Sequence, residues 1–322
     1  MPSLRSLRSL SCCLPVLAAL VFAAGCEQQP RQPPAVDTTT TPPLPPPQDT
    51  VQPRPRTTTW DSTAGPALFV HAPPGIPGAT LVVTPDADSD APIDSSTFDV
   101  RRLRNLPVEM FTRAGQVGQG QLGRVSEHAD TSSCALWPIA TLTGAPSVPA
   151  TWAIGFQRGR ARAIPVDSIE TLASQDSARL AADLTRLASA LPNDTAAALR
   201  GIPFSVRSAY RLALNARDTA IVAHIIRKLT IEANPLEEHI FLIAERDTTF
   251  RSTWRVAYSE RTSGSEENVE TTDALAAVAI GSSRRPTIVL ERSGDAARAF
   301  SILQRVASGQ WRARWTSVYT GC

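Results

Sequence analysis

The sequence has 322 residues, of which 42% are hydrophobic and 19% are charged. This composition is typical of a globular protein, and the length allows one or two domains with a substantial core. The formal net charge is +2, and Arg5 and Arg8 in the N-terminal segment supply both charges. The rest of the chain is balanced in charge, so nothing in it indicates binding to nucleic acid.

The N-terminal segment has the features of a secretory signal peptide. Two arginines precede an uncharged apolar stretch at residues 10–24, which ends in small residues. The stretch contains Pro15 and is shorter than the roughly 20 residues that a membrane-spanning helix needs. We therefore expect the chain to be exported and residues 1–25 to be removed.

The end of this segment reads Ala23-Ala24-Gly25-Cys26. It resembles the lipobox of bacterial lipoproteins, in which a small residue precedes a cysteine that receives diacylglycerol. Ala23 departs from the pattern, because leucine is usual at that position. The resemblance implies that Cys26 is lipidated and anchors the protein in a membrane, since several acyl chains together hold a protein stably. Glu27 after the cysteine implies the outer rather than the inner membrane.

The alternative is cleavage by an ordinary signal peptidase near the same place, which leaves Cys26 as a free thiol. In either case residues 26–59 are rich in proline and threonine and offer little to bury. Such a segment is expected to be a disordered tether. Fully extended, it would reach on the order of 100 Å.

From Trp60 onward, alternating apolar and polar residues predict a β-rich globular domain over residues 60–322, with 60–165 and 166–322 as candidate subdomains. Pro138 places its strand at an edge or a bulge. In the first half, strands are expected at residues 66–71, 79–84, 108–115, 121–127, 135–142 and 151–159.

A long amphipathic helix is predicted over residues 168–191, because apolar side chains recur there at helical spacing. Asp167 can cap its start, and Pro192 ends it. A gap in the apolar stripe between Ala173 and Leu180 leaves open a break into two shorter helices.

The second half again has the pattern of antiparallel strands. Two groups, roughly residues 202–259 and 272–319, each have the size of four strands. The predicted fold class is therefore α+β, mostly antiparallel β with one helix, and a propeller-like arrangement is the alternative. The later strands are expected at residues 238–246, 253–259, 273–280, 286–292, 298–306 and 311–319.

Cysteine usage suggests one disulfide. Two of the five cysteines lie in the signal segment, and a lipidated Cys26 leaves Cys134 and Cys322 as a pair. An oxidising compartment permits their disulfide. Because the two are far apart in sequence and lack the CxxC spacing, a structural role is expected rather than a redox one.

No motif in the sequence predicts a catalytic site, a metal site or a cofactor. Residues 86–90 carry alternating carboxylates, but the glycine and the glutamate that a calcium loop needs are missing. The glycines of residues 115–120 are followed by further strand pattern, so a bulged hairpin is expected instead of a phosphate loop. The four histidines lack metal-binding spacing and are interpreted as surface or core residues; they are His71, His128, His224 and His239.

One group of residues is a candidate binding surface, because tryptophan and arginine are frequent in binding hot spots. Strand alternation places Trp311 and Trp315 on one face of a strand, with Arg312 and Arg314 opposite, and Trp254 is expected nearby. The alternative is that the tryptophans are core residues that alternate with solvated arginines.

These features favour an envelope lipoprotein that acts as a non-catalytic binding or scaffolding module for an unidentified envelope protein or ligand. The alternative is a lipid-anchored extracytoplasmic hydrolase with a dispersed active site, because a catalytic triad is recognised by geometry and not by sequence order. Convergent histidine, serine and carboxylate side chains in a pocket would favour the enzyme.

Overall fold

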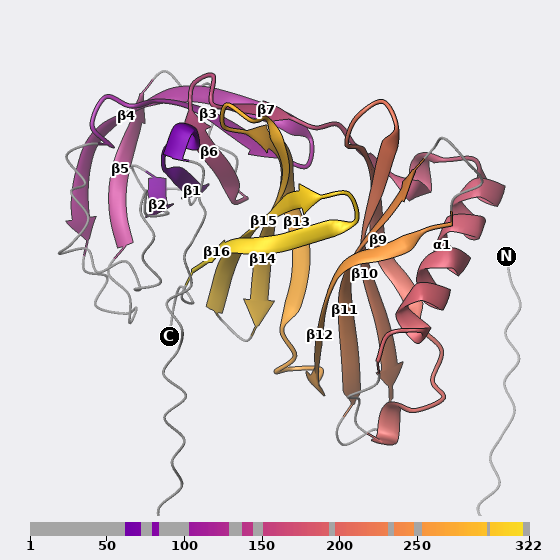
Figure 1. Cartoon of the computed structure of the whole chain (residues 1–322). Coiled ribbons are helices and arrows are strands. Elements are labelled where there is room, and N and C mark those ends of the chain that lie inside the picture. Colours follow the sequence, from indigo (N-terminus) through magenta and orange to yellow (C-terminus); the bar gives the residue numbers. More distant parts are fainter. Residues whose placement is uncertain are drawn as a thin grey trace, which may run out of the picture. The chain divides into compact units, whose positions relative to one another are not determined.

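The computed structural model describes nine stretches of the chain, within a compact unit that spans Pro53–Cys322. Their residues are mostly in antiparallel strands, with a single α-helix (Figure 1). The signal segment, the tether, residues 86–90 and Cys134 and Cys322 lie outside them. The stretches are residues 62–71, 79–83, 103–128, 137–143, 151–192, 197–230, 235–247, 253–294 and 297–317.

The first six strands form a closed barrel in the order β1-β2-β5-β4-β3-β6. Alternate side chains fill its interior, among them Leu68, Val108 and Met110, which are fully buried. The interior is narrow, because a Cβ atom at Gly155 would lie 2.8 Å from Val108 Cγ1. The strands are β1 Ala67–His71, β2 Ala79–Val83, β3 Pro107–Thr112, β4 Gly115–His128, β5 Trp137–Thr143 and β6 Ala153–Gln157.

The glycine-rich segment at residues 115–120 lies at the start of β4 and forms a hairpin with β3. The register of this pair shifts between Met110 and Phe111, and Gly115 has a φ of 99°. A positive φ of this kind is readily adopted by glycine. The predicted bulged hairpin is therefore confirmed.

Two five-stranded sheets follow the barrel. We call them the helix-side sheet, in the order β12-β11-β10-β9-β8, and the barrel-side sheet, in the order β16-β15-β14-β13-β7. The helix-side strands are β8 Val166–Ser168, β9 Ser205–Ala213, β10 Asp218–Leu229, β11 Leu236–Asp247 and β12 Arg255–Ser265. The barrel-side strands are β7 Ala161–Ala163, β13 Thr271–Ile280, β14 Arg285–Gly294, β15 Ala297–Ala307 and β16 Gln310–Thr316.

Each sheet consists of four consecutive strands joined as a meander, plus one short strand that precedes the helix. The two predicted four-stranded groups are β9–β12 and β13–β16. The first region of the described chain is a closed barrel and not a further sheet of this kind. The described residues therefore do not form a propeller.

The helix α1 spans Ser174–Ser189, a shorter range than the predicted 168–191. The start of the predicted range instead extends β8 and forms a short 3-10 helix, Ile169–Thr171. Ser168, and not Asp167, caps that turn by accepting a hydrogen bond from Glu170 N. No helix among the described residues has the length and apolar content needed to cross a membrane.

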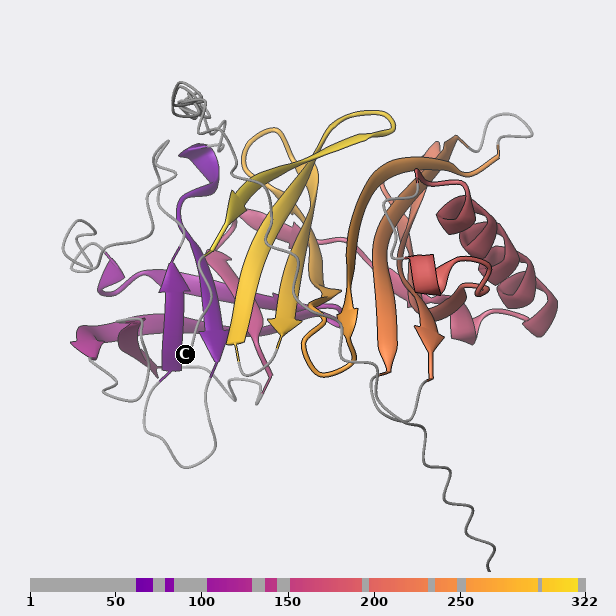
Figure 2. The ribbon, with the colours of Figure 1, turned by 90° about the horizontal axis from the view of Figure 1, so that it is seen from below.

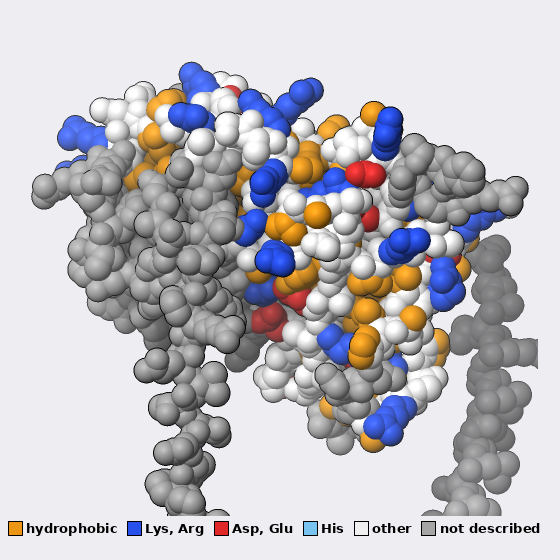
Figure 3. All heavy atoms as spheres, in the orientation of Figure 1, with side chains coloured by type: hydrophobic (Ala, Val, Ile, Leu, Met, Phe, Trp, Pro, Cys, Tyr) orange, Lys and Arg blue, Asp and Glu red, His pale blue; other side chains and the backbone are white. Residues whose placement is uncertain are grey.

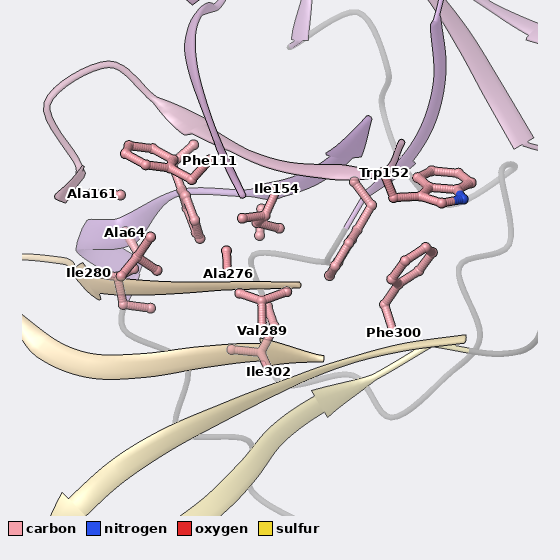
Figure 4. Close-up of a cluster of buried hydrophobic side chains, with 14 residues drawn as sticks. Ala64, Phe111, Trp152, Ile154, Ala161, Ala276, Ile280, Val289, Phe300 and Ile302 are labelled. Carbon is pink, nitrogen blue, oxygen red and sulfur yellow. The ribbon is translucent and has the colours of Figure 1, made fainter. Parts of the chain in front are cut away.

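Three hydrophobic clusters join the layers of the fold. The first lies between the barrel and the barrel-side sheet, where Phe69 stacks on Phe300 at 4.2 Å between ring centroids, and Figure 4 shows the surrounding side chains. The second lies between the two sheets. The third joins Leu184 and Leu187 of α1 to the opposite face of the helix-side sheet (Figure 2). Both sheets are therefore covered by apolar contacts on their two faces.

Candidate functional site

A row of titratable side chains lies between the two sheets. It consists of Glu237, His239 and His224, which are 8%, 3% and 6% exposed. We call it the Glu–His–His chain. Each member uses its side chain to contact the next, so the row is a candidate for proton transfer or for catalysis.

Strand register brings these residues together. In the β10–β11 pair, Ile226 lies opposite His239 and Phe241 opposite His224. The two histidines are therefore diagonal neighbours on one face of the sheet, within reach of each other. Glu237 shares that face because it is two residues from His239 on the same strand.

The hydrogen bonds of the Glu–His–His chain indicate which ring nitrogen carries each proton. His239 Nε2 lies 2.7 Å from Glu237 Oε2, and His239 Nδ1 lies 2.8 Å from His224 Nε2. An ionised carboxylate only accepts, so His239 donates from Nε2. If His239 is neutral, its Nδ1 then accepts from His224 Nε2, which leaves His224 Nδ1 as an acceptor.

Neighbouring charges hold Glu237 ionised. Burial alone would raise its pKa, but hydrogen bonds with His239 and Lys228 outweigh burial and lower the pKa. Lys228 Nζ lies 3.0 Å from Glu237 Oε1 and 2.6 Å from Glu266 Oε1. The pKa of Lys228 is raised by its hydrogen bonds to Glu266 and Glu237. The row thus ends in an ion pair at the surface.

The other end of the row is neutral at pH 7. Burial lowers the pKa of His224 from its ordinary value of 6.5 to about 4, and electrostatic interaction with His239 and Arg207 acts in the same direction. Asp273 and Glu237 oppose the shift but do not outweigh it. His224 is therefore a hydrogen-bonding core residue, and it takes up a proton only in acid.

The row lacks the remaining parts of a catalytic site within the part of the chain that the structure describes. No hydroxyl or thiol there is hydrogen-bonded to either histidine ring. No group of three or more His, Cys, Asp and Glu in the described stretches is arranged to hold a metal ion. Glu238, next to His239 in sequence, points to the opposite face and pairs with Arg227 and Arg261.

A second polar cluster joins the sheets around Glu245. Arg305 donates to both of its carboxylate oxygens, at 2.9 and 2.8 Å, and Trp311 Nε1 donates to it at 2.6 Å. Gly309 N also donates to Glu245, at 2.8 Å. Glu245 therefore fixes the turn between β15 and β16 against β11.

The structure separates the residues of the predicted Trp and Arg surface. Trp254 and Trp311 are each only 5% exposed and belong to the core. Trp315 is half-buried and packs on the hydrophobic cluster between the barrel and the barrel-side sheet, whereas Arg312 is exposed. The tryptophans therefore do not form one outer surface with the arginines.

A β-bulge explains why the alternation of residues predicted one face for both Trp311 and Trp315. Ile302 pairs with Trp315 but Leu303 pairs with Ala313, so the register shifts at Arg314. An extra residue of this kind reverses the alternation of side chains beyond it. Trp311 and Trp315 consequently lie on opposite faces of the sheet, and the expectation of a shared face is wrong.

A small cavity lies between the two sheets. Its volume is about 10 Å³, and the residues that line it include Arg113, Tyr210, Val222 and Ala277. Such a volume holds about one water molecule. This cavity therefore has no room for an organic substrate.

Comparison of the whole chain with protein-family models, curated proteins and solved structures finds no match.

The sequence analysis did not predict the Glu–His–His chain, because it judged the four histidines by their spacing along the sequence. The usable signal was the hairpin: residues 224 and 239 lie at similar distances from the turn between two predicted strands. Pairing those strands would have placed the two histidines close together.

Proposed function

We propose that this chain is a lipid-anchored protein of the bacterial envelope that acts as a non-catalytic binding or scaffolding module. The resemblance of Ala23-Ala24-Gly25-Cys26 to a lipobox supports the anchor, and the outer membrane is its proposed destination. The Pro/Thr-rich residues 26–59 would hold the folded unit away from the membrane. A Cys134–Cys322 disulfide is part of the same proposal, because export would place both thiols in an oxidising compartment.

One observation carries the non-catalytic part of the proposal: both histidines of the Glu–His–His chain are buried, and only its Glu237 end meets an ion pair at the surface. A general base must reach the proton that it removes, directly or through one water. The two histidines are 6% and 3% exposed, and each bonds to another member of the row. These contacts suit a group that holds two sheets together better than one that meets a substrate.

The layered fold supports the same proposal. We class it as α+β, with the helix confined to one face of the helix-side sheet. Apolar clusters on both faces of each sheet give a solid framework. A framework of this kind presents its surface, and not an internal cleft, to other molecules.

The test is intact mass and membrane fractionation of the native protein beside a Cys26→Ala variant. The expected result is a diacylglyceryl mass on Cys26 and release of the variant into the soluble fraction. A soluble, unlipidated native protein would overturn the anchor. Turnover of ester, phosphoester or peptide substrates that is lost in a folded His239→Gln variant would overturn the non-catalytic role and support the hydrolase.

A further inference from the structure

Three arginines lie close together at one end of the barrel-side sheet. Arg285 begins β14, and Arg312 and Arg314 lie on β16. Among the described residues, neither Arg285 nor Arg312 forms an ion pair. Other arginines of this sheet do pair with carboxylates, as in Arg305 with Glu245.

The register of the sheet places a buried amide among these arginines. Gln304 lies opposite Thr287 on one side and opposite Arg312 on the other, so the three share a row on one face. Arg285 shares that face because it is two residues from Thr287 on β14. Neighbouring strands are about 4.8 Å apart, which brings these side chains within reach of one small ligand.

Gln304 has a donor without a partner. Its side chain is 2% exposed, its Oε1 accepts a hydrogen bond from Arg314 Nε at 3.2 Å, and its Nε2 has no hydrogen-bond partner. Rotating the amide would set its NH₂ group against the Arg314 donor, so the orientation is fixed by that contact. A buried donor left unpaired costs about 1–3 kcal/mol, so an acceptor at this position would stabilise the fold.

The arginines repel one another. The pKa of Arg314 is lowered, first by burial and then by the positive charges of Arg285 and Arg312. An anion between the guanidinium groups would remove this repulsion. Basic side chains also predominate over acidic ones on the face drawn in Figure 3, which would favour the approach of an anion.

We propose that Arg285, Arg312, Arg314 and the Gln304 amide form a binding site for a phosphate group. Guanidinium groups match phosphate oxygens with paired hydrogen bonds, and a phosphate has enough oxygens for several arginines and one amide donor. The source of the phosphate is either a soluble phosphate compound or the headgroup of an anionic lipid. This site would be where the binding module proposed above holds its ligand. The inference therefore rests on that proposed function.

The test measures binding of inorganic phosphate to the full chain carrying Cys26→Ala, by the rise in melting temperature against chloride at equal ionic strength. The Arg285→Gln/Arg312→Gln variant should bind phosphate about tenfold more weakly or worse, because charged hydrogen bonds are lost. Gln304→Met should weaken binding in the same direction. Arg255→Gln, which changes an exposed arginine on β12, should bind as the parent chain does.

A second arm identifies the source. The same proteins are sedimented with vesicles of phosphatidylcholine, with or without phosphatidylglycerol. Binding to phosphatidylglycerol vesicles that the arginine substitutions abolish identifies the lipid headgroup, whereas binding of inorganic phosphate alone identifies a soluble compound. No binding in either arm, or binding that the double variant retains, would overturn the site. Since all these chains lack the lipidated cysteine, the result is separate from the test of anchoring.

Discussion

At the scale of single residues, burial decides what the titratable side chains can do. His224 and Glu237 lie on one face of the helix-side sheet, yet burial leaves the first neutral and hydrogen bonds keep the second ionised. Each member of the polar row has a hydrogen-bond partner, which is the condition for placing such groups in a core. Its main consequence is therefore on stability, and that consequence depends on pH.

Stability should fall in acid through His224. Its pKa is about 4 in the folded protein and 6.5 when unperturbed, so between these values only the unfolded chain binds the proton. The contribution is complete above pH 6.5 and is lost as the pH falls toward 4. Between pH 7 and pH 5 the loss from this residue should be about 2 kcal/mol of unfolding free energy.

Urea denaturation of the parent chain and of His224→Gln at both pH values measures this loss. The difference between the two proteins isolates His224 from the titratable and charged groups that act on it, which are His239, Arg207, Asp273 and Glu237. If the variant loses as much stability on acidification as the parent, the assignment to His224 is refuted.

At the scale of elements, alternation and turn signals were enough to predict most of the strands. The expected ranges 79–84 and 273–280, for example, correspond to β2 and β13. Two features depend on how the strands pair, which alternation within one strand does not give. They are the bulge at Arg314, which reverses the faces of β16, and the contact between His224 and His239. The strands β7 and β8 were missed because each has only three residues and gains its structure from a neighbouring sheet.

Glu245 connects elements that are distant in sequence, so its removal should weaken the contact between the two sheets and lower the stability of the fold. In Glu245→Ala, Arg305 keeps its hydrogen bond to Asp218, but Trp311 Nε1 loses its acceptor. Breaking a buried ion pair in this way typically costs about 3–5 kcal/mol. Guanidinium unfolding monitored by circular dichroism gives the value, with the exposed Glu267→Ala as control. A loss equal to that of the control would show that the cluster contributes nothing.

At the scale of the whole described unit, the apolar clusters continue from the barrel through both sheets to α1. A substitution in the cluster between the barrel and the barrel-side sheet should therefore destabilise all layers together. Phe300→Ala removes the ring that stacks on Phe69 and should cost about 3–5 kcal/mol. Circular dichroism and tryptophan fluorescence should give coincident unfolding curves in both proteins. Separate transitions would mean that the barrel unfolds independently.

The short strands β7 and β8 place a constraint on synthesis. Both belong to the segment 161–168 that follows the barrel, yet Ala161–Ala163 pairs with β13, which begins only at Thr271. A ribosome makes the chain from its N-terminus, so β7 has no partner strand until most of the protein has emerged. The edge of β7 therefore stays open throughout this interval, a state in which a chaperone would have its best opportunity to bind.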